Sequence, residues 1–191
     1  MLGKRNIYLI GPMGTGKTAV GKHLARVLAM PFVDSDAEVD RAAGVDIPYI
    51  FDEEGEPGFR RREHQALVEL CAREPMVLAT GGGAVLDPAN RELLKQSGVV
   101  VFLQTSVQQQ LQRVGNGRGR PLLKGGREGL REKLEQLRIT RDPLYRETAD
   151  VIISTDGRRV PRVAELILRE LGLRKATGDG ARRRGEGTAG L

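Results

Sequence analysis

Tryptophan is absent from the 191 residues of this sequence, and aromatic residues make up only 4% of it. With so few rings available to stack on bases, the composition argues against a nucleic-acid-binding protein. The single cysteine, Cys71, excludes a disulfide within the chain, as is usual for proteins of the cytoplasm. No apolar run approaches the roughly 20 residues that span a bilayer. We therefore expect a cytoplasmic protein with no membrane partner.

Positive charge is in excess, and it is unevenly placed. The formal net charge is +6, and residues 174–191 alone hold five basic and two acidic side chains together with five glycines. Such a segment buries too little apolar surface to fold, so we expect residues 174–191 to be a disordered basic tail. Residues 1–173 have the length of a single domain with a sizeable core.

A glycine-rich loop near the N-terminus is the most informative feature. Residues 11–18 read GPMGTGKT and fit G-x-x-x-x-G-K-[ST], between an apolar run at 7–10 and helical spacing over 19–28. Backbone N–H groups of such a loop surround phosphate oxygens, while its lysine reaches the β- and γ-phosphates and its hydroxyl binds Mg²⁺. The loop thus predicts binding of ATP or GTP. The predicted ligand residues are Gly14, Thr15, Gly16, Lys17, Thr18 and Ala19.

Strand and helix patterns alternate along the rest of the chain. Short apolar runs predict strands over residues 6–10, 32–34, 76–80, 99–103 and 151–154. Helices are expected over residues 17–30, 35–43, 47–53, 57–73, 88–97, 107–114, 129–140 and 161–171. This alternation predicts a three-layer α/β fold, a parallel sheet with helices on both faces. Nucleotide would lie at the carboxyl ends of the strands.

Two carboxylates, Asp34 and Asp36, follow the second predicted strand. In an extended chain, positions two apart point the same way and lie about 6.6 Å apart. One carboxylate can then hold the hydration shell of Mg²⁺ while the other orients a substrate hydroxyl for phosphoryl transfer. The structural alternative is that Ser35 or Asp36 caps the next helix, which is compatible with catalysis by the other residue.

An arginine run opens the helix predicted over residues 57–73. Arg60 lies at the edge of the apolar stripe, and Glu63 lies one turn further on, where it can orient the guanidinium. An arginine so placed suits a planar carboxylate, which it grips with two parallel bonds. For Arg61 and Arg62, a solvated helix face is the better interpretation.

Glycines mark two further candidates. Gly81, Gly82 and Gly83 follow the third predicted strand and permit a ligand to approach the backbone closely, although a tight turn explains them equally well. Residues 115–126 combine glycines with basic residues, which predicts a mobile lid over the phosphates. Arg141 is a candidate ligand for a carboxylate or phosphate.

Together these motifs resemble the shikimate kinase family, which phosphorylates the 3-hydroxyl of shikimate. The matching pieces are residues 11–18, 34–36, 55–63, 80–83, 120–123, 141 and 143–145. They stand in the family's order and spacing over residues 4 to 172. The resemblance implies a P-loop fold like that of nucleoside monophosphate kinases, with a five-stranded parallel sheet in the order 2-3-1-4-5. It implies ATP, Mg²⁺ and shikimate as ligands, and we expect a monomer.

The resemblance also implies a role for each matched residue. Thr18 binds Mg²⁺ directly and Asp34 binds it through water. Asp36 holds the reacting hydroxyl and acts as the base. Arg60 and Arg141 clamp the shikimate carboxylate.

The remaining implied roles divide between donor and acceptor. Lys17 holds the phosphates, and Arg120, on a lid over about 113–126, closes on the transferred phosphoryl group. The other implied contacts are shikimate with the backbone of Gly81, Gly82 and Gly83, adenine with Arg113, and the adenine pocket with Arg158. Residues 34–73 would form a shikimate-binding insertion.

Two alternatives stay open at this point. The first is another small-molecule kinase of the same fold, acting on gluconate or a nucleoside monophosphate; Asp36, Arg60, Arg141 and the glycine run argue against it. The second is a nucleotide-dependent nucleic-acid-binding module that is not an enzyme, suggested by the basic tail and a pI near 9.8.

Overall fold

Five parallel strands form the centre of the structure, a computed structural model that describes residues 5–73, 75–114 and 126–173. The strands are β1 (Asn6–Ile10), β2 (Phe32–Asp34), β3 (Val77–Ala79), β4 (Gly98–Gln104) and β5 (Val151–Ser154). Their order in the sheet is β2-β3-β1-β4-β5, as expected. β1 therefore lies between β3 and β4, and the loops after β1 and β3 leave the same edge of the sheet side by side.

Alternate residues of each strand supply two separate cores, because successive side chains of a strand point to opposite faces. Ile7 and Leu9 of β1 pack on the same side as Val101 of β4. Tyr8 and Ile10 pack on the other side. All five residues of β1 are buried, which is why residues 7–10 read as an unbroken apolar run in the sequence.

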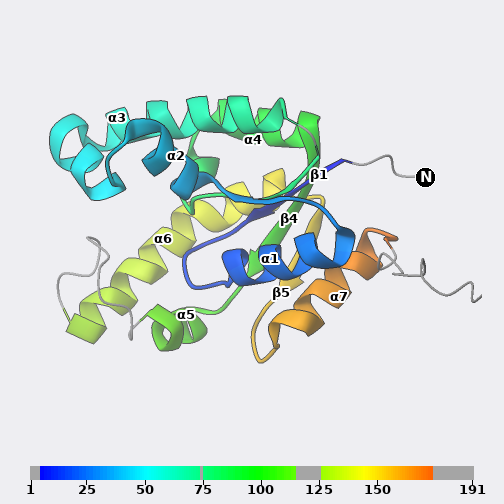
Figure 1. The fold of residues 1–191 in the computed structure, drawn as a ribbon. Coiled ribbons are helices and arrows are strands. Elements are labelled where there is room, and N and C mark those ends of the chain that lie inside the picture. Colours follow the sequence, from blue (N-terminus) through cyan, green and yellow to red (C-terminus); the bar gives the residue numbers. More distant parts are fainter. Residues whose placement is uncertain (1–4, 74, 115–125, 174–191) are drawn as a thin grey trace, which may run out of the picture.

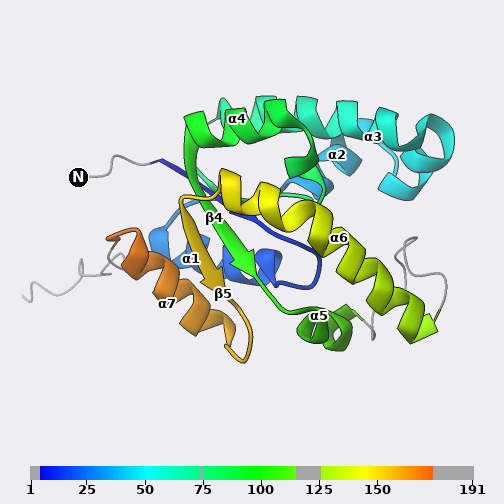
Figure 2. The same ribbon diagram turned by 180° about the vertical axis from the view of Figure 1, so that it is seen from behind.

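Helices cover both faces of the sheet (Figures 1 and 2). One face carries α1 (Lys17–Leu28) and α7 (Val160–Glu170). The other face carries α3 (Ile47–Cys71), α4 (Pro88–Ser97) and α6 (Gly126–Thr148). The remaining described helices are α2 (Ser35–Ala43), the 3-10 turn η1 (Ala84–Leu86) and α5 (Val107–Val114). Within the described ranges, no helix combines the length and apolar character needed to cross a membrane.

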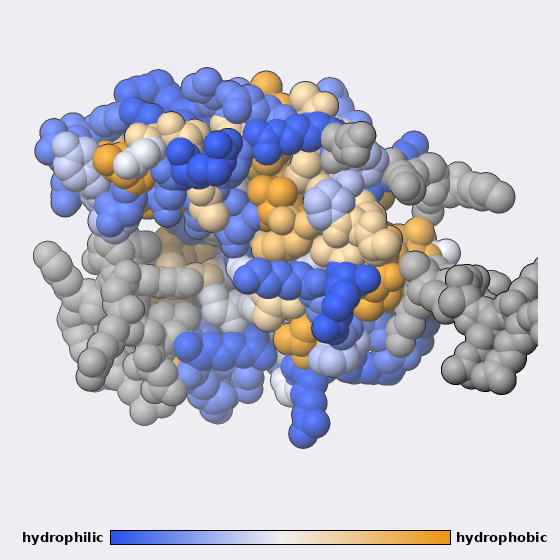
Figure 3. Space-filling view, viewed as in Figure 1, coloured by the Kyte–Doolittle hydropathy of each residue, from blue (hydrophilic) through white to orange (hydrophobic). Residues whose placement is uncertain are grey.

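Helix starts follow local signals in the sequence. Asp87 caps α4 by accepting a hydrogen bond from the N–H of Ala89, and Pro88 occupies the first turn, where a missing N–H costs nothing. Asp46 caps α3 in the same way. Polar side chains dominate the surface of the layer that holds α2 and α3 (Figure 3), as expected for helices that bury only their inner face.

The predicted break between the helices over 47–53 and 57–73 is confirmed: α3 is named as one element, but its backbone is not helical at Gly55, where φ is 68° and ψ is −177°. One predicted helix boundary is wrong. The helix expected over 129–140 runs on through Pro143 to the end of α6 at Thr148. Proline usually interrupts a helix, but α6 continues past Pro143, and Tyr145 in that next turn packs against Phe102 of β4.

An ion-pair network fastens α2 to the end of α3. The carboxylate of Glu38, which is buried, accepts hydrogen bonds from Arg41 at 2.8 and 2.9 Å and from Arg73 at 2.7 Å. Hydrogen bonds from Arg41, aided by those from Arg73, lower the pKa of Glu38 to about 2. The charged form of Glu38 therefore stabilises the packing of α2 on α3.

Replacing this carboxylate should make stability depend on pH in a defined direction. The folded pKa lies below the usual value of 4.5, so the charge stabilises the fold above that pH and the gain is lost as pH falls toward about 2. We expect Glu38→Gln to lower the free energy of unfolding by about 2 kcal/mol at pH 7. In urea unfolding at pH 7, 4 and 3, the difference from wild type should shrink. The exposed Glu53→Gln is the control, and a difference that stays constant with pH would contradict the assignment.

Candidate active site

The loop between β1 and α1 has the backbone that phosphate binding requires. Gly11, Gly14 and Gly16 have φ values of 139°, 77° and 88°, which other residues rarely adopt. At Gly11 a Cβ would also lie 2.5 Å from the carbonyl oxygen of Leu103 on β4. Since Gly16 leads directly into α1, the loop N–H groups and the helix N-terminus act on the same space.

Lys17 and Thr18 begin α1 together, with the predicted ligands Gly14, Thr15 and Ala19 beside them. The Lys17 ammonium donates to the carbonyl oxygens of Gly11 at 2.7 Å and Pro12 at 2.9 Å. The positive charge is thus held over the loop. A phosphate ligand would compete with these two carbonyls for the ammonium group.

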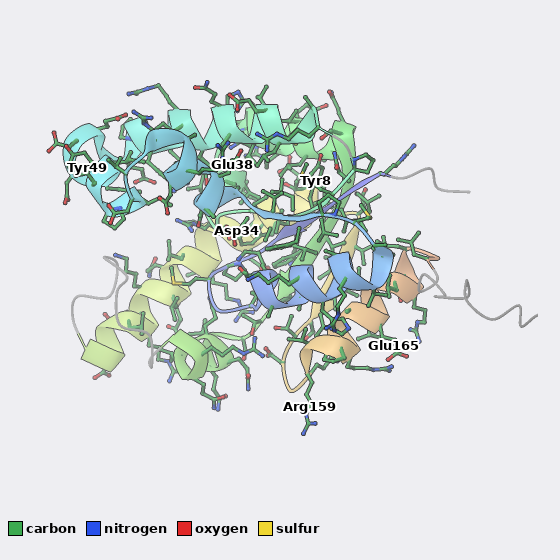
Figure 4. All side chains as sticks on the ribbon, viewed as in Figure 1. Tyr8, Asp34, Glu38, Tyr49, Arg159 and Glu165 are labelled. Carbon is green, nitrogen blue, oxygen red and sulfur yellow. The ribbon has the colours of Figure 1, made fainter. Side chains whose placement is uncertain are left out.

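Asp34, at the end of β2, joins the phosphate loop to the start of α2 (Figure 4). Its Oδ2 accepts a hydrogen bond from the Thr18 hydroxyl at 2.9 Å, and its Oδ1 accepts one from the N–H of Asp36 at 3.1 Å. Asp34 therefore caps α2, and the predicted capping by Ser35 or Asp36 is wrong. The extended arrangement expected for 34–36 is also wrong, because α2 already begins at Ser35 and turns Asp36 away from the strand direction.

Asp36 lies in the first turn of α2 with one carboxylate oxygen unpartnered. Burial raises the pKa of Asp36; the nearby charge of Asp34 raises it further, while Lys17 and Arg60 oppose the rise. Among the described residues, no protein group lies within hydrogen-bond distance of its buried Oδ1. An oxygen in this state is ready to accept a proton or a hydrogen bond from a ligand.

Arg60 and Glu63, on α3, form the ion pair that their spacing predicts. The Arg60 Nη1 donates to the Glu63 Oε2 at 2.6 Å, and Nη2 donates to Glu56 at 3.0 Å. Glu63 is 1% exposed, so its partner cannot be replaced by water without large cost. Burial raises the pKa of Glu63 against the lowering effect of Arg60, and the Glu63 Oε1 is buried without a partner.

Two of the three glycines after β3, Gly81 and Gly83, lie so close to this cluster that a side chain would collide with it. A Cβ on Gly81 would lie 2.6 Å from the Asp36 Oδ1 and 2.7 Å from the Glu63 Oε1. On Gly83, a Cβ would overlap the guanidinium of Arg60. The N–H of Gly81 donates to the hydroxyl of Ser35 at 3.0 Å, which fixes the loop beside α2.

Gly82 lies between the phosphate loop and α6. Its Cβ position is 3.6 Å from the Gly11 carbonyl oxygen and 3.7 Å from the Arg141 Nη1. Its own carbonyl accepts a hydrogen bond from Tyr145 at 2.5 Å. The bonds of Ser35 and Tyr145 to this loop were not predicted; for Tyr145 the signals were its place one helical turn after Arg141 and the match of residues 143–145 to the family.

Arg113 and Arg158, the two predicted adenine contacts, have different partners in the structure. Arg113 of α5 donates to the carbonyls of Gly14 at 3.0 Å and Thr15 at 3.3 Å, and also to Thr155 after β5. Arg158 is exposed and donates to the Ser154 carbonyl. Arg113 therefore joins the donor loop to the segment after β5.

Other predictions fall outside the described residues. Arg120, residues 115–125 of the predicted lid and the predicted tail over 174–191 are among them.

These features define a class of protein. A parallel sheet in this order, a phosphate-binding loop after its central strand and a cluster of carboxylates and arginines beside that loop describe a P-loop kinase with a nucleoside-monophosphate-kinase-like fold.

Comparison with known proteins identifies the family. The family model "Shikimate kinase" matches residues 13–172. Shikimate kinase of Thioalkalivibrio sulfidiphilus is 52% identical over 86% of this chain and 85% of that protein. The structure of shikimate kinase from Acinetobacter baumannii in complex with shikimate has 51% identity and a TM-score of 0.83, covering 87% of this chain and 92% of that one. The chain belongs to the shikimate kinase family and is an ATP-dependent kinase, which decides against a non-enzymatic module.

Because Gly81 fits closely against two carboxylates, a change to alanine should lower the stability of the protein there, whereas the same change at the open position Gly129 should raise it. Gly81→Ala pushes a methyl group onto oxygens of Asp36 and Glu63, and we expect a loss of about 1–3 kcal/mol in the free energy of unfolding. In the control Gly129→Ala on α6, the Cβ meets nothing within 4 Å, and stability should rise by about 0.5–1 kcal/mol. Urea unfolding measures both, and a neutral Gly81→Ala would contradict the geometry.

Proposed function

We propose that this protein transfers the γ-phosphoryl group of ATP to the 3-hydroxyl of shikimate, giving shikimate 3-phosphate and ADP. The observation that carries the proposal is the convergence of the unpartnered oxygens of Asp36 and Glu63 and the Arg60 guanidinium around the glycine loop after β3. This cluster adjoins the phosphate loop and offers acceptors for hydroxyls and a cation for a carboxylate. Shikimate carries both kinds of group.

The donor half of the site is the loop at residues 11–18. The N–H groups of Gly14, Thr15, Gly16 and Ala19 and the Lys17 ammonium would bind phosphate oxygens. The Thr18 hydroxyl and the Asp34 carboxylate, 2.9 Å apart, are oxygen ligands of the type that Mg²⁺ takes, so these residues fit that ion. When bound there, Mg²⁺ would neutralise phosphate charge.

The acceptor half uses charges of both signs. Arg60 and Arg141 would hold the shikimate carboxylate from two helices, and the backbone of Gly81, Gly82 and Gly83 would contact the ring substituents.

In the reaction, the shikimate oxygen forms a bond to the γ-phosphorus while the bond from that phosphorus to the β,γ-bridging oxygen breaks. Asp36 accepts the proton of the attacking hydroxyl. In a loose transition state, orienting that hydroxyl matters as much as removing its proton.

Three arginines complete the proposed site. Arg113 and Arg158 lie near the segment after β5 and are assigned to the adenine end of ATP. Arg120 is assigned to the transferred phosphoryl group on the strength of the sequence resemblance. We further propose that the protein acts as a monomer and does not bind nucleic acid.

A coupled assay of ADP release tests the proposal and its main alternative. With ATP and Mg²⁺, shikimate should support turnover, while gluconate and nucleoside monophosphates should not. Reactions without an acceptor give the background ATPase rate. No turnover above background with shikimate would refute the proposed function.

The role of Asp36 makes a separate prediction about rate. Asp36→Asn keeps the shape of the side chain but removes the acceptor of the proton, so we expect kcat to fall by about 10²–10⁴-fold while the KM for ATP changes little. Because burial raises the pKa of Asp36, wild-type kcat should fall on the acid side at a pH above the usual range of aspartate. The exposed Asp52→Asn is the control. An equal loss of kcat and ATP affinity would count against Asp36 as the proton acceptor.

A further inference from the structure

Tyr145 holds the glycine loop from the side opposite α2 and α3. It lies on α6 one turn after Arg141, and its hydroxyl donates to the carbonyl oxygen of Gly82, 63 residues earlier in the chain. Gly82 in turn faces both the phosphate loop and the Arg141 guanidinium. A single side chain thus connects a loop of the acceptor site to the helix that supplies one of its arginines.

The tyrosine is itself firmly placed. Its side chain is 2% exposed, and its ring stacks on Phe102 of β4 with 4.9 Å between ring centroids. Burial raises the pKa of Tyr145 to about 12 against the opposing effect of the Arg141 guanidinium. The hydroxyl therefore keeps its proton at physiological pH and remains a hydrogen-bond donor.

The hydrogen bond from Tyr145 to the Gly82 carbonyl also fixes the direction of the next backbone N–H, that of Gly83. The Gly82–Gly83 peptide is trans, so its carbonyl and the N–H of Gly83 point in opposite directions. Glycines rotate freely about φ and ψ, and three in succession have no side chains to restrain them. Backbone bonds from Ala84 to the Gly81 carbonyl and from Leu86 to the Gly83 carbonyl shape the turn. The bond from Tyr145 adds a side-chain restraint on the peptide that leads to Gly83, against which the Arg60 guanidinium lies.

We propose that Tyr145 is a positioning residue of the acceptor site: its hydroxyl holds the Gly82–Gly83 peptide in place relative to Arg60 and Arg141. This inference rests on the proposed function, since it assigns Tyr145 to the binding of shikimate. It places the larger effect of the residue on the acceptor substrate, because the bonded peptide leads to Gly83, which lies against Arg60, and faces Arg141.

Tyr145→Phe removes the hydroxyl and keeps the stacked ring. We expect the KM for shikimate to rise about tenfold, which corresponds to about 1.4 kcal/mol, with kcat and the KM for ATP changed by less than about twofold. Titration calorimetry with shikimate should show the same tenfold loss of affinity without turnover.

The matched control is Tyr8→Phe. The Tyr8 hydroxyl is equally buried and is bonded to Asn6 at 2.9 Å and Ser97 at 2.8 Å, near the edge of the sheet where β4 begins. The Tyr8 hydroxyl is bonded to Ser97 just before β4 begins, whereas Asp34, also labelled in Figure 4, ends β2 beside the phosphate loop. Thermal unfolding of both variants measures the structural cost of losing a buried hydroxyl, and Tyr8→Phe should leave the shikimate KM at the wild-type value.

The outcomes separate the inference from the function on which it rests. An active wild type with an unchanged shikimate KM in Tyr145→Phe overturns the inference and leaves the function standing. Equal rises in the KM values for shikimate and ATP, or a similar rise in Tyr8→Phe, also overturn it, because they indicate a general structural effect. A wild type that neither binds nor phosphorylates shikimate refutes the proposed function, and the inference with it.

Discussion

The close approach of two carboxylates to Gly81 is the constraint on which the acceptor side of the site depends. Oxygens of Asp36 and Glu63 occupy the space that a side chain at position 81 would need. A side chain at position 81 would therefore have to push these two carboxylates aside. This arrangement brings residues from three elements to the edge of the sheet where the phosphate loop begins, and it leaves the backbone itself as part of the surface.

Such a cluster needs its charges balanced. Burial disfavours the ionised forms of Asp36 and Glu63, and Lys17 and Arg60 act against that effect. The arginine bonds one oxygen of Glu63 and leaves the other without a partner. The cations thus favour the ionised carboxylates, whose unpartnered oxygens can accept a hydrogen bond from a hydroxyl. A buried apolar cluster of the same volume would be easier to fold but would offer a substrate no such contact.

The features that the sequence predicted and those that it missed differ mainly in how far apart in the sequence the interacting residues lie. The phosphate loop and the Arg60–Glu63 pair were predictable because their residues lie within one turn or one motif of each other. The capping of α2 by Asp34 was not, since three neighbouring polar residues could each have served. The hydrogen bond from Tyr145 to Gly82 spans 63 residues, and no local pattern encodes it. The course of α6 through Pro143 was also missed, because local propensity disfavours a proline inside a helix.

The glycine loop after β3 is held by side chains from two parts of the structure: from α2 and α3, and from α6. Ser35 and Glu63 reach it from α2 and α3, which Glu38 and Arg73 fasten to each other. Tyr145 reaches it from α6, stacked on the central sheet. The Gly82 carbonyl and Arg141 therefore belong to the part of the acceptor site that α6 attaches to the central sheet, and Arg60 belongs to the part that α3 supplies.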